Sequence, residues 1–520
     1  MGQRSSRIPA AGTLNDPLLL AIDLGSQSVR ARLYDRQGQS HARADVALCE
    51  PQSRHNGWAE HEPGYLQSAV ADACCEALSA ADLRQRVAGV GLTTVRASVV
   101  LVDRKGTPLR PIIMWSDKRR LRQPPQPRGI ARLAHYLPLL GPTLRQVQGE
   151  AECNWVARHE AKTWANTHKM LLLSGYLNHW LTGNFLDAAA AQVGYVPFDP
   201  RRGDWAGERN WRWQLLPVLN RGMLPDLRPV STALGRVCER AAAATRIPPG
   251  TPVIASAGDK ACEVLGSAPA RKATAYLSLG TAAATNLYTD TYRQPHWLMP
   301  AFPAAIPGHW LLERQIDRGM SVVGSFAQQI GASLPDIDAR DRAQLDQLLQ
   351  RSPPGANGLG VNPFVQPGTD IYRSLDGYSD SRHTPADIYR ALLEGLCFAL
   401  RHGTQRLQQR RGRTAVDRVC IAGGGARSHD VVNLVADIFA LPAGRTQQRE
   451  AATLGVAIDT AVGVGLYPDH PAAIAAMCKV PDYSPVRAAE ARIYQPLFEQ
   501  FVKQYGAMAD AAAIPGQDHS

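Results

Sequence analysis

LLLAIDLGSQSVRARLYD, residues 18–35, is the stretch that decides the fold. An apolar run interrupted only by Asp23 leads into the turn Gly25-Ser26-Gln27, after which apolar and basic side chains alternate. This pattern predicts a β-hairpin with a half-exposed second strand. About half a chain later, YLSLGTAAATNLY (276–288) repeats the design, with Gly280-Thr281 at its turn. Two similar lobes, each opening with such a hairpin, are the simplest explanation.

The two turns have the chemistry of phosphate-binding loops. Glycine lets an anion approach the backbone closely, and the Ser or Thr that follows adds a hydroxyl donor. Asp23 stands on the strand that enters the first turn, and a buried carboxylate there suits Mg²⁺, usually through water. A pair of ordinary tight turns is the alternative. The sequence has no P-loop lysine motif, so a Walker-type nucleotide fold is disfavoured.

Composition narrows the class of protein. A chain of 520 residues, 45% hydrophobic and 20% charged, fits a two-domain globular enzyme. No apolar run approaches the roughly 18 residues of a membrane span, and the polar start lacks a signal-peptide core. The nine cysteines are scattered without a C-x-x-C motif, which predicts reduced thiols and a cytoplasmic protein. The net charge of +11 is spread along the chain, which favours attraction of nucleotides over nucleic-acid binding.

Strands alternate with helices in both halves, which predicts an α/β architecture. Strands are expected at 87–92, 98–103 and 419–422, and residues 155–183 are expected to be mostly helical. Thr384-Pro385 begins a long helix that runs to about residue 409.

Asp259 lies where a strand meets a helix. TPVIASA (251–257) reads as an apolar strand, Gly258-Asp259 breaks it, and KACEVLG begins a helix. A helix N-terminus favours a negatively charged side chain, so a carboxylate that faces a ligand is one interpretation. A simple N-cap aspartate is the alternative.

Several segments match one known family in order and spacing: AIDLGSQSVRARLYD, LLLSGYLNHWLTG, GTPVIASAGDKACEVLG, YLSLGTAAATNL and IAGGGARSHDVVNLVADIFALP. Together they resemble the FGGY family of carbohydrate kinases, within the actin–hexokinase–Hsp70 superfamily, over nearly the whole chain. The resemblance implies a two-lobed ribonuclease H-like fold with a duplicated core and a central ATP cleft. It also implies an N-terminal lobe at 17–257 with the sugar site and the first phosphate loop, and a C-terminal lobe at 258–510 with the second phosphate loop and the adenosine site. The residues at the two ends of the chain predict a flexible tail at 1–16 and a frayed tail at 511–520.

The resemblance assigns roles by position. It makes Asp259 the general base that accepts the proton of the sugar hydroxyl, and it places Asp23, with Asp259, near Mg²⁺. The nucleotide-binding residues that it implies are those of the first phosphate turn (Gly25, Ser26, Gln27), the second phosphate turn (Gly280, Thr281), the adenosine loop (Gly423, Gly424, Gly425) and the nucleobase pocket (Ser428, Asn433).

The acceptor pocket departs from the familiar branches of that family. Thr94-Val95-Arg96-Ala97-Ser98 keeps the arginine of glycerol kinases, but Ala97 replaces their glutamate, and the Gln-Met-His-Gly of xylulokinases is absent. Glu152 stands where the family's first signature has a lysine. Thr94 and Arg96 are candidate acceptor contacts, although a charged residue between strands is often a solvated turn residue. Trp58 and Lys260 are further candidates, with packing and an exposed helical position as their alternatives.

The sequence therefore predicts an ATP- and Mg²⁺-dependent kinase of a small sugar or polyol, with a ketopentose such as xylulose as the favoured acceptor. Ribulose, another polyol and glycerol stay open within this class, and so does an uncharacterised branch of the family. The alternative function is a catalytically weak sensor that binds sugar and ATP and acts through a partner. The expected partner is a small molecule, without nucleic acid or membrane, and a homodimer is left open.

Overall fold

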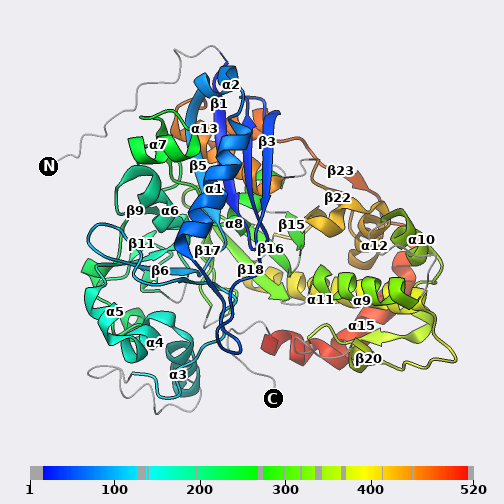
Figure 1. Cartoon of the computed structure of the whole chain (residues 1–520). Helices are drawn as coiled ribbons and strands as arrows, with labels where there is room; N and C mark the ends of the chain where they lie inside the picture. The colour runs from blue at the N-terminus through cyan, green and yellow to red at the C-terminus, as the bar shows by residue number, and fades with distance from the viewer. Residues whose placement is uncertain are drawn as a thin grey trace. The chain divides into compact units, whose positions relative to one another are not determined.

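The computed structural model describes residues 16–125, 136, 140–193, 196–267, 273–280, 282–296, 299–316, 319–333, 342–364, 371–412, 414–447 and 450–512. The chain divides into two compact units, both drawn in Figure 1. The first comprises Met1–Pro269, Phe302–His309 and Glu450–Cys478, and the second comprises Ala270–Ala301, Trp310–Arg449 and Lys479–Ser520. The predicted terminal tails lie almost wholly outside the described residues.

The first unit is built on a six-stranded sheet with the order β13-β14-β5-β1-β2-β3. The predicted hairpin lies within it: β1 and β2 are antiparallel, and Leu24 faces Val29 beside the turn. β3 continues the antiparallel pairing, β5 lies parallel to β1, β14 lies parallel to β5, and β13 closes the sheet antiparallel to β14. The strands are β1 (Leu18–Leu24), β2 (Ser28–Tyr34), β3 (Ser40–Ala47), β5 (Val87–Thr94), β13 (Ala233–Arg236) and β14 (Pro252–Ile254).

The second unit repeats the spatial order and the orientations of these six strands, although its edge strand β23 follows β22 along the chain whereas β13 precedes β14. Its strands run in the order β18-β16-β15-β21-β22-β23. The orientations also match: β15 is antiparallel to β16, β16 to β18 and β22 to β23, whereas β15, β21 and β22 are mutually parallel. The duplicated core expected from the two hairpins is therefore confirmed. The strands are β15 (Thr274–Leu279), β16 (Ala283–Thr289), β18 (Trp310–Ile316), β21 (Arg418–Ala422), β22 (Ala443–Arg445) and β23 (Asp482–Ser484).

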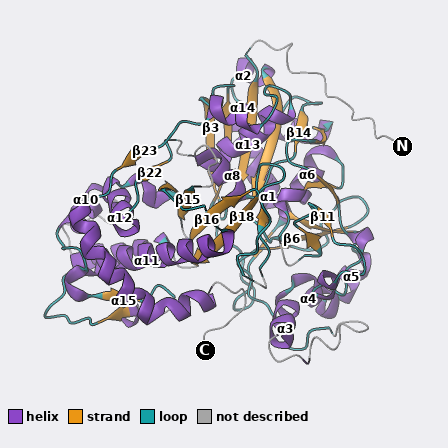
Figure 2. Ribbon diagram, turned by 180° about the vertical axis from the view of Figure 1, so that it is seen from behind, coloured by secondary structure: helices purple, strands orange, loops and turns teal. Residues whose placement is uncertain are grey.

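Helices cover both faces of the sheet in the first unit. α1 (Pro63–Ala77) packs on the face that carries Leu18, Leu20, Ile22 and Leu24. Figure 2 shows α13 (Ala451–Gly463) across the opposite face. It approaches β5 closely, because a Cβ added at Gly91 would lie 2.4 Å from the hydroxyl oxygen of a threonine on this helix. Successive residues of a strand point to opposite faces, so Asp23 lies on the α13 side.

Paired glycines explain why the division of the chain differs from the predicted lobes. A Cβ at Gly266, on α8 (Asp259–Ser267), would lie 2.0 Å from the Ala451 carbonyl oxygen, and a Cβ at Gly455 would lie 2.0 Å from that of Cys262. Only glycine permits backbones to approach so closely. The sequence predicted a boundary between residues 257 and 258; the structure instead keeps both α8 and α13 with the first unit.

The predicted helical region at 155–183 is wrong in its middle, where β8 (Lys169–Leu172) separates α5 (Ala161–Asn166) from α6 (Leu173–Thr182). β8 pairs with β6 (Val99–Val102) in a four-stranded sheet. The apolar run at the end of β8 is compatible with a buried strand as well as with a helix. The other described α-helices and strands of this unit are α2 (Ala81–Gln85), α3 (Leu140–Glu150), α4 (Glu152–His159), α7 (Glu239–Thr245), α14 (His470–Met477), β4 (Glu60–His61), β7 (Ile112–Ile113), β9 (Leu186–Ala188), β10 (Phe198–Asp199), β11 (Asp204–Trp205), β12 (Asp226–Arg228) and β17 (Phe302–Pro303).

The core of the second unit gathers around its longest helix, α11 (Pro385–Arg411). Thr384 caps this helix as predicted, in a capping box with Asp387. The other helices and strands of the unit are α9 (Met320–Ser333), α10 (Arg342–Gln350), α12 (His429–Phe439), α15 (Ala488–Ala512), β19 (Gly360–Val361) and β20 (Leu375–Asp376). Among all described helices, none is long and apolar enough to cross a bilayer, and none of the nine cysteines forms a disulfide.

Candidate active site

Asp259 is the first residue of α8 and is held at a fixed position. β14 ends at Ile254, so the predicted strand is shorter than expected and residues 255–258 form a loop. Hydrogen bonds hold this loop: Ala255 N donates to the Thr232 carbonyl at 2.8 Å, and Gly258 N donates to the Ala190 carbonyl at 3.1 Å. Asp259 Oδ1 accepts the Lys260 N–H at 2.8 Å. The Asp259 side chain stays 26% exposed, so its carboxylate is accessible to a ligand.

Arg96 meets Asp259 directly, which excludes the solvated-turn interpretation. Its Nε lies 3.3 Å from Asp259 Oδ1, and its guanidinium carbon lies 4.6 Å from the centre of the Phe302 ring. The Arg96 side chain is only 19% exposed. Ala97 follows with a left-handed φ of 63°, a conformation that residues other than glycine rarely adopt and that is often found at functional sites.

Asp23 lies beneath this pair in a cluster of charges. It is 4% exposed, and Arg30 Nη1 donates to its Oδ2 at 3.1 Å. Arg30 Nε lies 3.4 Å from Glu450 Oε2. Burial raises the pKa of Asp23 to about 6, the Arg30 guanidinium opposes this shift, and the charges of Asp259 and Glu450 add to it. The structure therefore brings Asp23 and Asp259 close enough to interact electrostatically.

Arg30 and Glu450 were missed by sequence reasoning. Arg30 reads as one of two basic residues on an exposed strand face, and Glu450 is the residue before α13, far along the chain. The one usable signal was the alternation along β2, which places Arg30 opposite Asp23 in the hairpin register.

The first predicted phosphate turn is open at its glycine and serine. A Cβ at Gly25 would lie 3.4 Å from the Ser28 carbonyl oxygen, an ordinary contact, so the fold itself does not require glycine there. Ser26 is exposed, and its Oγ accepts the Trp115 Nε1–H at 3.0 Å. Gln27 is exposed, and its carbonyl accepts the Leu48 N–H at 2.8 Å. These features leave space for a ligand at the turn.

The second unit carries the matching turn at Gly280; Thr281 lies outside the described residues. The start of α9 lies against this turn, because Met320 N donates to the Gly280 carbonyl at 2.9 Å. A Cβ at Gly319 would lie 2.5 Å from Ala283 N. Sequence reasoning missed Gly319, since its segment has no capping signal that marks a helix start near the turn.

The three glycines of the predicted adenosine loop differ in what they do. Gly423 has φ 92°, and a Cβ on it would lie 2.7 Å from the Leu279 carbonyl oxygen. A Cβ at Gly425 would lie 2.9 Å from the Leu279 Cβ. Gly424 is exposed with nothing within 4 Å of an added Cβ. Gly423 and Gly425 therefore serve the fold, and Gly424 is the one that presents open backbone.

Ser428 and Asn433 lie on or beside α12. The Ser428 hydroxyl caps this helix by accepting the Val431 N–H at 3.1 Å, and it donates to Asp346 Oδ1 at 2.5 Å. The hydroxyl of Ser428 is therefore used in hydrogen bonds that stabilise the fold. Asn433 is half-buried on the same helix.

Three candidate acceptor contacts have other partners. Thr94 is buried, and its hydroxyl donates to the Val95 carbonyl at 3.1 Å. Trp58 packs on the Arg119 guanidinium at 4.1 Å, which agrees with the packing alternative. Lys260 Nζ lies 3.2 Å from Glu263 Oε2 along α8. Of the predicted acceptor residues, Arg96 is the one that the structure places on Asp259.

Glu152 begins α4 beside a second group of acids. Burial of its carboxyl raises the pKa of Glu152 to about 7; the charges of Asp117 and Glu150 add to the shift, and Arg119 opposes it. An unfolded chain would titrate this group near 4.5. Between pH 4.5 and 7 the folded state therefore binds more protons, and its stability falls as the pH rises through this window.

Glu152→Gln is accordingly expected to raise the melting temperature at pH 8, where the half-buried carboxylate is ionised, and to change it little at pH 5. Thermal unfolding of both proteins at the two pH values measures this difference. An equal gain at both pH values would contradict a burial penalty on the ionised group.

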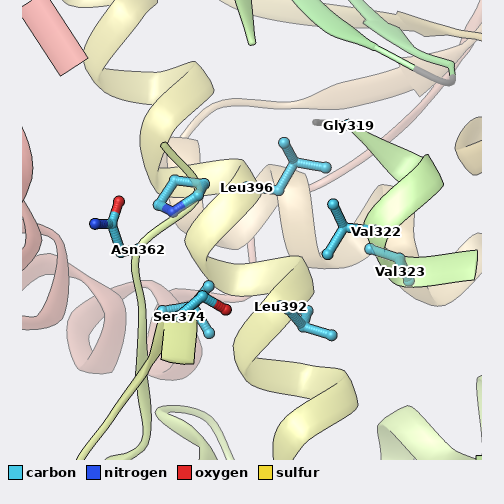
Figure 3. A pocket seen from close by; sticks show the side chains of 9 residues that line it. Gly319, Val322, Val323, Asn362, Ser374, Leu392 and Leu396 are labelled. Carbon is cyan, nitrogen blue, oxygen red and sulfur yellow. The ribbon is translucent and has the colours of Figure 1, made fainter. Parts of the chain in front are cut away.

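A small hollow, partly open to solvent, lies within the second unit. Figure 3 shows that α9 and α11 line it with Val322, Val323, Leu392 and Leu396, together with Asn362 and Ser374. This lining is mostly apolar. It suits a triphosphate poorly, and none of the glycines at 423–425 is among the described residues that line it.

Comparison with known proteins decides the family. Residues 18–266 match the N-terminal domain, and residues 275–464 the C-terminal domain, of the FGGY family of carbohydrate kinases. The chain belongs to this family. It is a sugar kinase, and membership implies ATP as the phosphoryl donor, normally with Mg²⁺.

Individual relatives agree with this family. An uncharacterized sugar kinase of Escherichia coli K12, YgcE, is 30% identical over 500 residues, which cover 94% of this chain and 91% of the relative. A xylulose kinase of Haemophilus influenzae is 26% identical over 458 residues, or 85% of this chain and 90% of the relative. The crystal structure of a xylulose kinase from Rhodospirillum rubrum matches the fold with a TM-score of 0.79 at 24% identity, covering 95% of this chain and 99% of that one.

Proposed function

We propose that this sugar kinase transfers the γ-phosphoryl group of ATP to a hydroxyl of a ketopentose such as xylulose, with Asp259 as the general base. The observation that carries the proposal is the Asp259 carboxylate, accessible at the start of α8 with the Arg96 guanidinium 3.3 Å from it. A base of this kind must come within hydrogen-bond reach of the proton that it removes. The Asp259 side chain is 26% exposed, which supports this role toward a hydroxyl bound beside Arg96.

In phosphoryl transfer, the protein mainly positions the acceptor hydroxyl against the γ-phosphate and neutralises the charge on the transferred group. The acceptor hydroxyl loses its proton to Asp259 as its oxygen bonds to the γ-phosphorus, and the bond to the ADP oxygen breaks. Arg96 supplies fixed donors to the acceptor's oxygens. Gly25, Ser26, Gly280 and Gly424 are the described positions proposed to receive the nucleotide.

Mg²⁺ fits the acids of the first unit. Among the described residues, no group of three or more His, Cys, Asp or Glu side chains forms a metal cage. Mg²⁺ in nucleotide enzymes is usually held by one or two carboxylates together with phosphates and water, a role open to Asp23 and Asp259. When bound, the ion neutralises charge on the transferred phosphate.

Two observations favour an acceptor longer than glycerol. Ala97 has no side chain beyond its Cβ, so the position leaves room beside Arg96. Several relatives with matches over most of their length are xylulose kinases.

A coupled assay that detects ADP tests the function. Xylulose, ribulose, glycerol and other polyols are offered in turn with Mg-ATP, and acceptor-dependent ADP release is the expected result. Binding of ATP and a sugar without acceptor-stimulated turnover would instead identify a sensor.

Gly424→Val is expected to raise the KM for ATP, or to prevent ATP binding, with little change in the KM for the acceptor. An added Cβ at this position meets nothing within 4 Å in the protein, so the fold should tolerate a side chain that a nucleotide would not. Steady-state kinetics with each substrate varied in turn measures the effect, and the melting temperature controls for folding. An unchanged KM for ATP would place the nucleotide elsewhere.

A further inference from the structure

A buried acid–base pair lies beneath the loop that carries Asp259. Asp459, on α13, is 0% exposed, and His470, the first residue of α14, is 5% exposed. His470 Nε2 lies 3.0 Å from Asp459 Oδ1 and 3.2 Å from Ser231 Oγ. Neither the motif assignments nor the proposed mechanism uses these side chains.

The pair is bonded to the loop at both of its ends. Asp459 Oδ2 accepts the Ala257 N–H at 3.3 Å, two residues before Asp259. At the other end, the Ser231 N–H donates to the Ala255 carbonyl at 2.8 Å. Hydrogen bonds thus form a closed ring from Ala255 through Ser231, His470 and Asp459 to Ala257.

The remaining polar group of Ala257 is held as well. Its carbonyl accepts the Thr93 hydroxyl at 2.8 Å and the Cys262 thiol at 3.3 Å. The Ala257 N–H, in turn, is bonded to Asp459 on α13. Removing this acceptor leaves a buried donor without its partner, which is costly.

Stability alone does not account for a carboxylate at this place. The rest of α13 is mainly apolar and buried, and well-packed hydrophobic residues often replace buried ion pairs without loss of stability. What an apolar side chain cannot do is accept the Ala257 N–H and thereby fix the backbone that leads into Asp259.

We propose that Asp459 and His470 are positioning residues that hold the 255–258 loop so that the Asp259 carboxylate meets the acceptor hydroxyl in line with the γ-phosphate. The inference rests on the proposed role of Asp259. A misplacement of about 1 Å at such a group can lower the rate by about 10²-fold.

Three variants separate positioning from stability. Asp459→Leu keeps the branched shape and removes the acceptor. The double variant Asp459→Leu/His470→Phe also removes the stranded imidazole, so that an apolar pair replaces the polar one. Asp459→Asn keeps an oxygen for the Ala257 N–H and an amide group that can donate to His470.

We expect kcat to fall about 10- to 100-fold in both leucine variants, with the KM for ATP within about 2-fold of native. The double variant should melt higher than Asp459→Leu and still show the low kcat. Asp459→Asn should restore kcat to within about 3-fold of native, which a loss of buried volume or charge would not explain.

Asp437→Leu is the matched control. Asp437 is a buried acid on α12 that also accepts a main-chain N–H, that of Arg487, and the Arg487 guanidinium. Its loss should lower the melting temperature and spare kcat. A native kcat in the double variant, or an equal fall of kcat in Asp437→Leu, would overturn the proposal. If Asp259→Asn itself were fully active, the proposed function would fail instead, so the two failures are distinguishable.

Discussion

Asp259→Asn is expected to lower kcat by about 10²–10⁴-fold, the usual effect of losing a general base. The asparagine oxygen can still accept the Lys260 N–H, which Asp259 Oδ1 accepts at 2.8 Å, so the local backbone should persist. The amide cannot take up a proton, and it cannot form the ion pair with Arg96. The fold and the affinity for ATP should therefore survive while turnover is lost.

Acceptor-dependent ADP release, the dissociation constant for ATP and the melting temperature together measure this result. Asp226→Asn is a suitable control, because it makes the same chemical change at an exposed acid of the same unit that pairs with Arg221. The control should leave all three quantities unchanged. A nearly native kcat in Asp259→Asn would remove Asp259 from the mechanism.

Local patterns predicted the elements that carry this chemistry. Both hairpins, the strand before Gly423, the capped start of α11 and the junction at Asp259 follow from short stretches in which turn residues interrupt apolar runs. Within such stretches, glycine, caps and alternation are strong signals. The motifs and their order could therefore be predicted without the structure.

Contacts between segments that are distant in sequence could not be predicted from such patterns. Glu450 meets Arg30 from more than four hundred positions away, and nothing in either segment alone identifies its partner. The same holds for the close approach of Gly266 to α13. This contact joins a segment from the C-terminal half of the chain to the first unit. β8 was misassigned for a different reason, since a short apolar run does not distinguish strand from helix.

The role of a residue also depends on the free space around it, which the sequence does not show. The triplet at 423–425 reads as three equal glycines, yet only Gly424 has open space beside it. For Arg96 the sequence left a solvated turn residue open beside an acceptor contact, yet its side chain is 19% exposed and lies on Asp259. In both cases it is the structure that distinguishes a residue that serves the fold from one that can contact a ligand.

Arg96→Ala is expected to raise the KM for the true acceptor by about tenfold or more, equivalent to about 1.4 kcal/mol or more. The guanidinium offers five donors in a rigid fork and no acceptor, which suits a substrate rich in hydroxyl and carbonyl oxygens. Its packing over the Phe302 ring at 4.6 Å and its contact with Asp259 fix that fork. The KM for ATP should stay nearly unchanged.

Arg96→Lys separates charge from geometry in this prediction. Lysine keeps the positive charge near Asp259 but loses the planar fork, so its acceptor KM should lie between those of the native enzyme and Arg96→Ala. Glycerol, which is too short to use the room beside Ala97, should be a poor acceptor next to five-carbon ketoses or polyols. Robust phosphorylation of glycerol, with an acceptor KM that Arg96→Ala does not change, would overturn this view of the pocket. The kinase assignment would stand, because it depends on the family match and not on Arg96.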